Sequence, residues 1–236
     1  LQSYSAPVKE YSVKVLATCP HDDGAYTQGL FFHEGRLIES TGQYGASSLR
    51  EVDLETGEVK TIRRFGRNFF AEGSVVFDGT LYVLTWQNHQ LFAYDPVTLE
   101  YKSTYSYPRE GWGLTTDGRS LIASDGSYNL YFLDEELKLT RTLKVTLGGR
   151  VQRYLNELEW IDGRIWANVY TTDTILVINP DTGVVEATLD CTGLLPRNLR
   201  TAGTDVLNGI ALSEDGKIYL TGKNWPRLYE IKAVRQ

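Results

Sequence analysis

Polar and aromatic side chains recur at regular intervals in this chain of 236 residues. They open five short apolar segments, at Gln28, Glu72, Trp112, Glu157 and Asn208, so that successive members lie 44, 40, 45 and 51 residues apart. If these segments are the inner strands of one fold, the five side chains approach one another. A carboxyl group enclosed by tryptophan and tyrosine loses water, and its raised pKa lets it carry a proton near neutral pH. The carboxyl groups of this set are therefore candidates for proton transfer.

Each of these residues opens one copy of a repeat. The openings read Gln28-Gly29-Leu30, Glu72-Gly73-Ser74, Trp112-Gly113-Leu114, Glu157-Leu158-Glu159 and Asn208-Gly209-Ile210. A turn with glycine follows each opening strand and leads to a second apolar strand; the turns contain Glu34-Gly35, Asp78-Gly79, Asp117-Gly118, Asp162-Gly163 and Asp215-Gly216. Such pairs between apolar runs signal hairpins, because glycine accepts a positive φ. A period of roughly 40 to 50 residues is typical of propeller blades.

Two further strands complete each copy, because third strands such as residues 91–94 and 175–178 end in turns rich in Asp, Asn, Pro and Gly. The fifth copy ends after its third strand, residues 227–231, and residues 11–16 can supply the missing fourth strand. That pairing closes the ring and removes exposed strand edges. The sequence therefore predicts an all-β fold, a five-bladed β-propeller of four-stranded antiparallel blades whose last blade is closed by the N-terminal strand. We expect one domain over residues 1–236, with residues 1–10 as a flexible extension.

Composition narrows the choice of partners and of compartment. The formal net charge is −6 and no Lys/Arg cluster is present, which argues against a nucleic-acid partner. No apolar stretch is long enough for a transmembrane helix, so no membrane partner is expected. The chain contains no methionine, so we expect it to have lost an N-terminal piece, for which a signal peptide is one explanation. Cys19 and Cys191 are compatible with a bridge or with two free thiols.

Several second strands end in residues that would emerge around the mouth of the predicted ring. Trp86 and Lys223 occupy matching positions in their copies, and Trp86, Trp112 and Trp225 lie beside Gly, Asn and Lys at strand ends. These three tryptophans are candidates for an aromatic wall around a small ligand. The alternative for each of them is a place in the core, and the alternative for each polar opening residue is a hydrogen bond to backbone or channel water.

The motifs around these residues resemble the plant-type and bacterial glutaminyl cyclases. The likeness spans nearly the whole chain, in the order Tyr26-Thr27-Gln28-Gly29-Leu30, Ser40-Thr41-Gly42-Gln43-Tyr44-Gly45, Ala71-Glu72-Gly73, Leu84-Thr85-Trp86, Glu110-Gly111-Trp112-Gly113-Leu114, Ser124-Asp125-Gly126-Ser127, Leu155-Asn156-Glu157-Leu158-Glu159-Trp160, Trp166-Ala167-Asn168-Val169, Leu207-Asn208-Gly209-Ile210 and Thr221-Gly222-Lys223-Asn224-Trp225-Pro226. The resemblance implies a five-bladed propeller that converts the N-terminal glutamine of peptides or proteins into pyroglutamate and releases ammonia. It also implies no cofactor for catalysis, and export to the periplasm or medium.

The chemistry of this cyclisation can be matched to the residues. The free α-amine must attack the γ-carboxamide carbon, and the departing nitrogen must receive a proton, because an amide anion is a very poor leaving group. One carboxyl group can take the first proton and deliver the second, and the resemblance assigns this shuttle to Glu72. Lys223 or an indole N–H of Trp86, Trp112 or Trp225 could stabilise the oxyanion, and Gln28 and Asn156 could position the amide or the amine. Asn208 completes the predicted substrate-binding set.

Two other function classes stay open at this point. One is a metal-dependent propeller hydrolase of the lactonase type, with Glu72, Asn156, Glu157 and Asn208 as oxygen ligands of an axial cation. Its three histidines, however, are scattered without ligand spacing. The other is a propeller that only binds a peptide, since the fold does not decide the function. A structural cation on the axis is compatible with either class. A closed ring offers no unpaired edge, so we expect a monomer.

Overall fold

A computed structural model of the chain describes residues 6–236, and nearly all of their regular structure is β-strand. Three separate sheets have four antiparallel strands each, with strand order following chain order. The first contains β2 (Thr27–His33), β3 (Arg36–Thr41), β4 (Ser48–Val52) and β5 (Val59–Arg64); the second β6 (Ala71–Phe77), β7 (Thr80–Thr85), β8 (Gln90–Tyr94) and β9 (Tyr101–Ser106); the third β10 (Leu114–Thr116), β11 (Leu121–Ser124), β12 (Asn129–Leu133) and β13 (Leu139–Lys144).

An eight-stranded sheet combines two further sets of four strands. One set is β16 (Leu155–Ile161), β17 (Arg164–Val169), β18 (Thr174–Ile178) and β19 (Val185–Asp190); the other is β20 (Leu207–Leu212), β21 (Ile218–Gly222), β22 (Arg227–Arg235) and β1 (Lys9–Pro20). The predicted pairing of the N-terminal strand with the last repeat is confirmed, because β1 pairs antiparallel with β22. The start of β1 also pairs in parallel with β19, which joins the two sets.

The predicted flexible extension is wrong for its last two residues. Residues 1–5 lie outside the described residues, but Lys9 and Glu10 belong to β1 and pair with Ala187 and Thr188 of β19. The remaining short elements are β14 (Thr146–Leu147), β15 (Arg150–Val151) and one 3-10 helix, Arg197–Leu199. Within residues 6–236, no helix has the length and apolar character needed to cross a membrane. Cys19 and Cys191 are free thiols.

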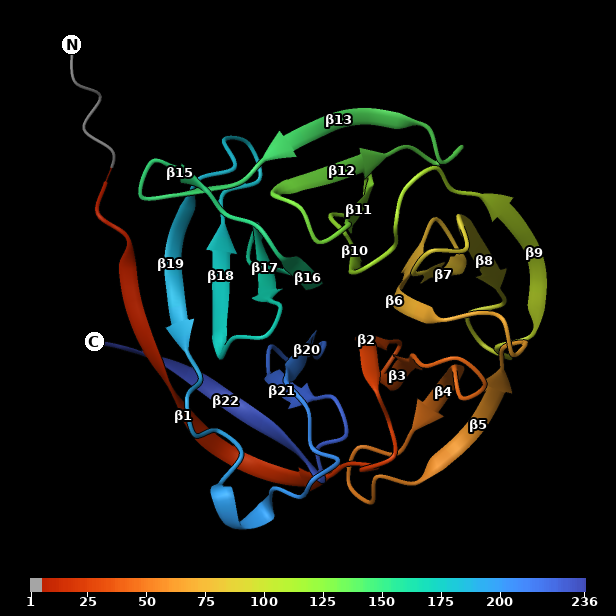
Figure 1. The fold of residues 1–236 in the computed structure, drawn as a ribbon, viewed down its shortest axis with the longest axis horizontal. Coiled ribbons are helices and arrows are strands. Elements are labelled where there is room, and N and C mark those ends of the chain that lie inside the picture. Colours follow the sequence, from red (N-terminus) through yellow and green to blue (C-terminus); the bar gives the residue numbers. More distant parts are fainter. Residues whose placement is uncertain (1–5) are drawn as a thin grey trace.

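The sets of strands surround a common axis (Figure 1). The first strand of each set, β2, β6, β10, β16 or β20, lies nearest the axis and contacts the first strand of the next set, and β20 returns to contact β2. Apolar cores fill each space between neighbouring sets, as where Leu30 and Leu37 of the first set pack with Tyr219 and Leu228 of the last. The ring of inner strands is therefore closed, and it brings residues from the whole chain to the axis.

Three of the predicted hairpin turns have the backbone that their sequence favours. Glu34-Gly35, Asp78-Gly79 and Asp162-Gly163 have φ values of 49° and 74°, 49° and 77°, and 49° and 73°. Two consecutive residues with positive φ are typical of the type I′ turn, whose twist matches that of the flanking strands. The other two turns span longer loops, since Thr116 pairs with Leu121 and Leu212 with Ile218.

A β-bulge interrupts four of the five inner strands at the opening motif. The register skips Gln28 between Thr27 and Gly29, Glu72-Gly73 between Ala71 and Ser74, Asn156-Glu157 between Leu155 and Leu158, and Asn208-Gly209 between Leu207 and Ile210. Bulges redirect side chains and are common next to active sites. This register corrects the fourth repeat, because Asn156 rather than Glu157 is equivalent to Gln28, Glu72 and Asn208. Glu157 stands where the other repeats have glycine.

Glycine after the opening residue allows neighbouring inner strands to come very close. A Cβ at Gly113 would overlap the carbonyl oxygen of Asn156, and a Cβ at Gly73 would lie 2.6 Å from the backbone nitrogen of Leu114. These neighbours are backbone atoms, so they cannot move aside as a flexible side chain would. The glycines therefore set the spacing of the bulges around the axis.

We expect Gly113→Ala to lower the free energy of unfolding by about 1–3 kcal/mol, because the added methyl group forces the third and fourth sets apart. Denaturant unfolding of the variant measures this loss. Gly203→Ala is the control, since the nearest heavy atom to its new Cβ is Thr201 Oγ1 at 3.9 Å. Equal stability of the two variants would contradict the close approach at Gly113.

Candidate active site

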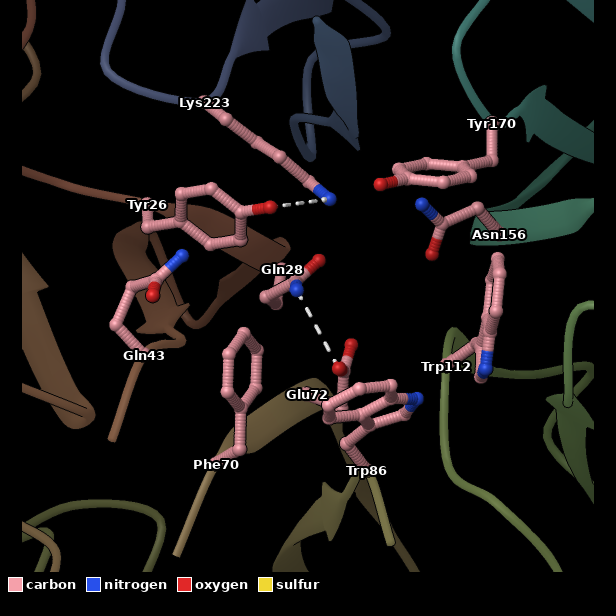
Figure 2. Close-up of a pocket in the computed structure, with 10 residues that line it drawn as sticks. All are labelled: Tyr26, Gln28, Gln43, Phe70, Glu72, Trp86, Trp112, Asn156, Tyr170 and Lys223. Atoms are coloured by element: carbon pink, nitrogen blue, oxygen red, sulfur yellow. Dashed lines mark hydrogen bonds between the residues drawn. The ribbon is translucent and has the colours of Figure 1, made fainter. Parts of the chain in front are cut away.

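A pocket of about 230 Å³ opens at one end of the ring axis. Figure 2 shows its side chains converging from several sheets; they are Tyr26, Gln28, Gln43, Phe70, Glu72, Trp86, Trp112, Asn156, Tyr170 and Lys223. Pockets for drug-sized ligands have volumes of roughly 300–1,000 Å³. This pocket is smaller and combines aromatic walls with one carboxyl group, one ammonium group and three amides, which suits a single polar residue.

Glu72 is the buried carboxyl group of the pocket, with 4% of its surface exposed. The bulge in β6 turns it toward the axis, between Phe70, Trp86 and Trp112. Burial raises the pKa of Glu72 well above its usual range, and the charge of Glu110 adds to this, whereas the charge of Lys223 acts in the opposite direction. The direction of this pKa shift is the one that the sequence predicted for a carboxyl group among aromatic side chains.

Glu72 is held by a series of amide hydrogen bonds. Gln28 Nε2 donates to Glu72 Oε1 at 3.3 Å, and Gln28 Oε1 accepts from Asn208 Nδ2 at 3.3 Å. Asn208 Nδ2 also donates to the carbonyl oxygen of Thr27 at 2.9 Å. The three residues occupy equivalent bulges in β6, β2 and β20. These hydrogen bonds fix the orientation of the Gln28 amide, so that its N–H group faces the carboxyl group of Glu72.

Lys223 extends from the end of β21 between two tyrosine rings. Its Nζ lies 4.6 Å from the ring centroid of Tyr26 and 4.7 Å from that of Tyr170, and it donates to Tyr26 Oη at 3.4 Å. Burial lowers the pKa of Lys223, although Glu72 and Asp205 act in the opposite direction. Only 2% of the residue is exposed. The two cation–π contacts thus hold the buried Lys223 Nζ at the pocket.

Asn156 and Trp112 lie across the pocket from Tyr26 and Phe70 (Figure 2). Asn156 Oδ1 is buried and accepts no hydrogen bond from the described residues. Because Asn156 lines the pocket, this free oxygen can accept a hydrogen bond from a ligand N–H. The Trp112 ring packs edge-on against Tyr170, with centroids 5.3 Å apart, and lies against the backbone of Gly126.

The structure brings six of the eight predicted site residues together: Gln28, Glu72, Trp86, Trp112, Asn156 and Lys223. The matching positions of Trp86 and Lys223 are confirmed. Each directly follows the residue of the second strand that pairs with the residue just before the bulge. Asn208 does not line the pocket; its amide is used to hold Gln28 and the backbone.

The prediction for Trp225 as a wall of the pocket is wrong. Asn224 has a φ of 61° and forms a turn between its two neighbours. Lys223, before the turn, lies in the pocket, whereas Trp225, after it, packs in the core between the fourth and fifth sets. Only 1% of Trp225 is exposed, and its indole N–H donates to the carbonyl oxygen of Asp205 at 2.9 Å. It cannot act as an oxyanion donor in this pocket.

Four lining residues were absent from the predicted set: Tyr26, Gln43, Phe70 and Tyr170. A signal for three of them exists in the repeat. Tyr26 and Phe70 directly precede the equivalent residues Thr27 and Ala71, and Tyr170 follows its second strand as Trp86 and Lys223 follow theirs. These positions match one another when the repeats are aligned on their bulges instead of on their glycines.

Comparison with known proteins agrees with this geometry. The family model described as glutamine cyclotransferase matches residues 1–233. A glutaminyl-peptide cyclotransferase of Arabidopsis thaliana is 41% identical over 226 residues, which cover 93% of this chain and 71% of the relative. The chain belongs to the glutamine cyclotransferase family. The crystal structure of Myxococcus xanthus glutaminyl cyclase superimposes with a TM-score of 0.91 at 36% identity, over 98% of this chain and all of that one.

Two members of the oxygen set considered for a lactonase-type cation have other partners in this structure. Glu157 Oε2 accepts from the backbone N–H of Ile210 at 2.7 Å, and Asn208 is held by Thr27 and Gln28. Only Glu72 and Asn156 of that set line the pocket. Residues 6–236 contain no group of three or more His, Cys, Asp or Glu side chains arranged to hold a metal ion.

Glu110 supports the pocket from its rim. It accepts from Trp112 Nε1 and from Gln87 Nε2, each at 3.1 Å, and its charge raises the pKa of Glu72. We expect Glu110→Gln to lower the pKa of Glu72, so that the ionisation of Glu72 in the pH profile of kcat/KM moves to lower pH. Glu136→Gln, on the exposed turn between β12 and β13, should leave the profile unchanged. A shift to higher pH in Glu110→Gln would contradict the electrostatic role.

Proposed function

We propose that Glu72 carries the proton in a reaction that cyclises an N-terminal glutamine to pyroglutamate and releases ammonia. The reaction itself follows from membership of the glutamine cyclotransferase family. The observation that supports Glu72 is its burial in the pocket where amide, aromatic and lysine side chains converge, with its pKa raised.

The proton path has two steps on one carboxyl group. The substrate α-amine, with an ordinary pKa of about 7.7–8.0, is partly neutral at physiological pH and attacks the γ-carbonyl carbon. Glu72 takes the proton that the attacking nitrogen loses and gives a proton to the departing nitrogen as the C–N bond breaks. The amine proton thus leaves with ammonia, and Glu72 returns to its initial state.

The oxyanion forms when the amine adds to the γ-carbonyl carbon, and we assign its stabilisation to Lys223. Its ammonium group is desolvated and held between two rings, so a developing negative charge interacts with it strongly. Asn156 offers an unused buried oxygen to a substrate N–H, and Gln28 orients the carboxyl group. Trp86, Trp112 and Tyr170 enclose the flexible glutamine side chain, which favours its folding for ring closure.

Several finer features belong to the same proposal. We describe the sets of strands as the blades of a five-bladed propeller that forms a single domain, with β1 completing the last blade. We propose that catalysis needs no metal or other cofactor, that the protein acts as a monomer without nucleic-acid or membrane partners, and that it is exported. A chelator experiment tests whether catalysis needs a metal.

Ammonia release from a short peptide that begins with glutamine tests the function, with the same peptide beginning with asparagine as the control. We expect release from the glutamine peptide alone, and no change in its rate with EDTA. The asparagine peptide is one methylene shorter and would have to close a strained four-membered ring. Absence of release from a well-folded protein would contradict the proposal, and loss of release with EDTA would contradict metal independence.

A further inference from the structure

The turn after β3 carries a side chain with no use in the fold. Gln43 lines the pocket on the side of Tyr26 and Phe70, opposite Trp112 and Asn156 (Figure 2). Gly42 N donates to the carbonyl oxygen of Tyr26 at 2.8 Å, and Ser47 Oγ donates to that of Gln43 at 2.7 Å. The backbone of the turn is therefore fixed, while the Gln43 amide makes no hydrogen bond within the described residues.

The backbone at Gln43 makes this free amide informative. Its φ is 90°, and the equivalent turns after β11, β17 and β21 have Gly126, Thr171 and Asn224 at φ values of 81°, 70° and 61°. Glycine accepts such a conformation without strain, whereas other residues do not. Asn224 uses its side chain, since Nδ2 donates to the carbonyl oxygen of Asp23. Gln43 bears the same backbone cost, and the pocket mouth is where its side chain can serve.

Aromatic side chains continue from this side of the pocket to the surface. Phe70 packs edge-on against Trp86 at a centroid distance of 5.5 Å and against Tyr44 at 5.3 Å. Phe70 is buried, but Tyr44 is 51% exposed. Tyr44 and Phe70 together offer an aromatic surface beside the pocket on which a bound apolar group would lose water.

We propose that Gln43 and Tyr44 form a subsite for the residue that follows the N-terminal glutamine of a peptide substrate. This inference rests on the proposed function, in which the first residue fills the pocket and the rest of the peptide leaves through its mouth. The Gln43 amide oxygen accepts the N–H of the first peptide bond, and Tyr44 with Phe70 packs against the second side chain. Peptides with an apolar or aromatic second residue are thus the favoured substrate class.

The side-chain part is tested with Gln-Phe-amide and Gln-Gly-amide, by ammonia release. We expect the wild type to favour Gln-Phe-amide in kcat/KM by about tenfold, as for a buried apolar contact. Tyr44→Ala should bring this ratio close to one. Tyr154→Ala is the matched control, because Tyr154 is 55% exposed and its backbone bonds to Gly126 and Tyr170 on the other side of the pocket.

Each outcome separates the subsite from the reaction. No release from either dipeptide would contradict the proposed function, whereas equal kcat/KM values in the wild type would overturn the subsite alone. A preference lost in Tyr154→Ala and kept in Tyr44→Ala would also overturn it.

The backbone part is tested with Gln-glycolamide ester, in which oxygen replaces the first peptide N–H of Gln-Gly-amide. The quantity compared is the ratio of kcat/KM for the amide to kcat/KM for the ester. We expect this ratio to be about threefold to tenfold higher in the wild type than in Gln43→Ala, roughly the effect of one hydrogen bond. Alanine keeps a Cβ at the same positive φ, so backbone strain is similar in both proteins. An amide-to-ester ratio that is the same in the wild type and in Gln43→Ala would overturn this hydrogen bond.

Discussion

Replacing Glu72 by glutamine is expected to lower kcat by about 10²- to 10⁴-fold, the usual contribution of a positioned acid–base group. The amide has nearly the shape of the carboxyl group and can still accept from Gln28 Nε2, so the pocket is retained. It can neither take a proton from the attacking amine nor deliver one to the departing nitrogen, so expulsion of that nitrogen becomes slow. Steady-state ammonia release measures the loss.

Glu159→Gln is the matched control for this substitution. Glu159 is also a buried carboxyl group on an inner strand, and burial raises its pKa to about 8. It lies in a separate cavity with His33, Thr116 and Trp160, and accepts from the backbone N–H of Leu212 at 3.1 Å. We expect turnover close to wild type in Glu159→Gln. Near wild-type turnover in folded Glu72→Gln would show that another group carries the proton.

The substitution Glu72→Gln also affects how stability depends on pH. The folded-state pKa of Glu72 is raised above the ordinary value of 4.5, so the folded protein binds more protons than the unfolded one above that pH. Stability therefore falls as the pH rises from 4.5 toward the folded-state pKa. Glu72→Gln should reduce this fall, which denaturant unfolding at several pH values measures. A steeper fall in the variant would contradict the raised pKa.

Replacing Lys223 by methionine is expected to lower kcat by about 10²- to 10³-fold, the effect of removing one oxyanion donor. Methionine fills the space between Tyr26 and Tyr170 with a chain of similar length, so the loss reports the charge rather than a cavity. Because Lys223 lowers the pKa of Glu72, its removal should also move the ionisation of Glu72 to higher pH.

Lys217→Met is the control, since Lys217 lies on the exposed turn before β21 and pairs with Asp215. We expect its kcat and pH profile to match those of the wild type. A Lys223→Met enzyme with unchanged kcat and a raised KM would assign Lys223 to ground-state binding instead of to the oxyanion. The direction of the pH shift tests the charge coupling to Glu72 independently of either role.

The sequence by itself determined the repeats, their hairpins and the strand that closes the last set. These features depend on local chemistry, because Asp-Gly and Glu-Gly turns impose positive φ, and alternating apolar residues impose strands. The same repeats identified Glu72, Trp86 and Lys223, since a side chain at a fixed place in each copy reaches a fixed place around the axis. The family motifs then added Asn156 to the predicted site.

The tertiary structure alone decided which member of each motif faces the pocket. At the bulges, hydrogen bonding between strands sets the register, so Asn156 rather than Glu157 is equivalent to Glu72, and the spacing of letters cannot reveal it. The turn at Asn224 and the packing around Trp225 direct that indole into the core. Whether Asn208 meets the ligand or holds Gln28 depends on contacts between sets of strands 180 residues apart in sequence, and such contacts form only when the ring closes.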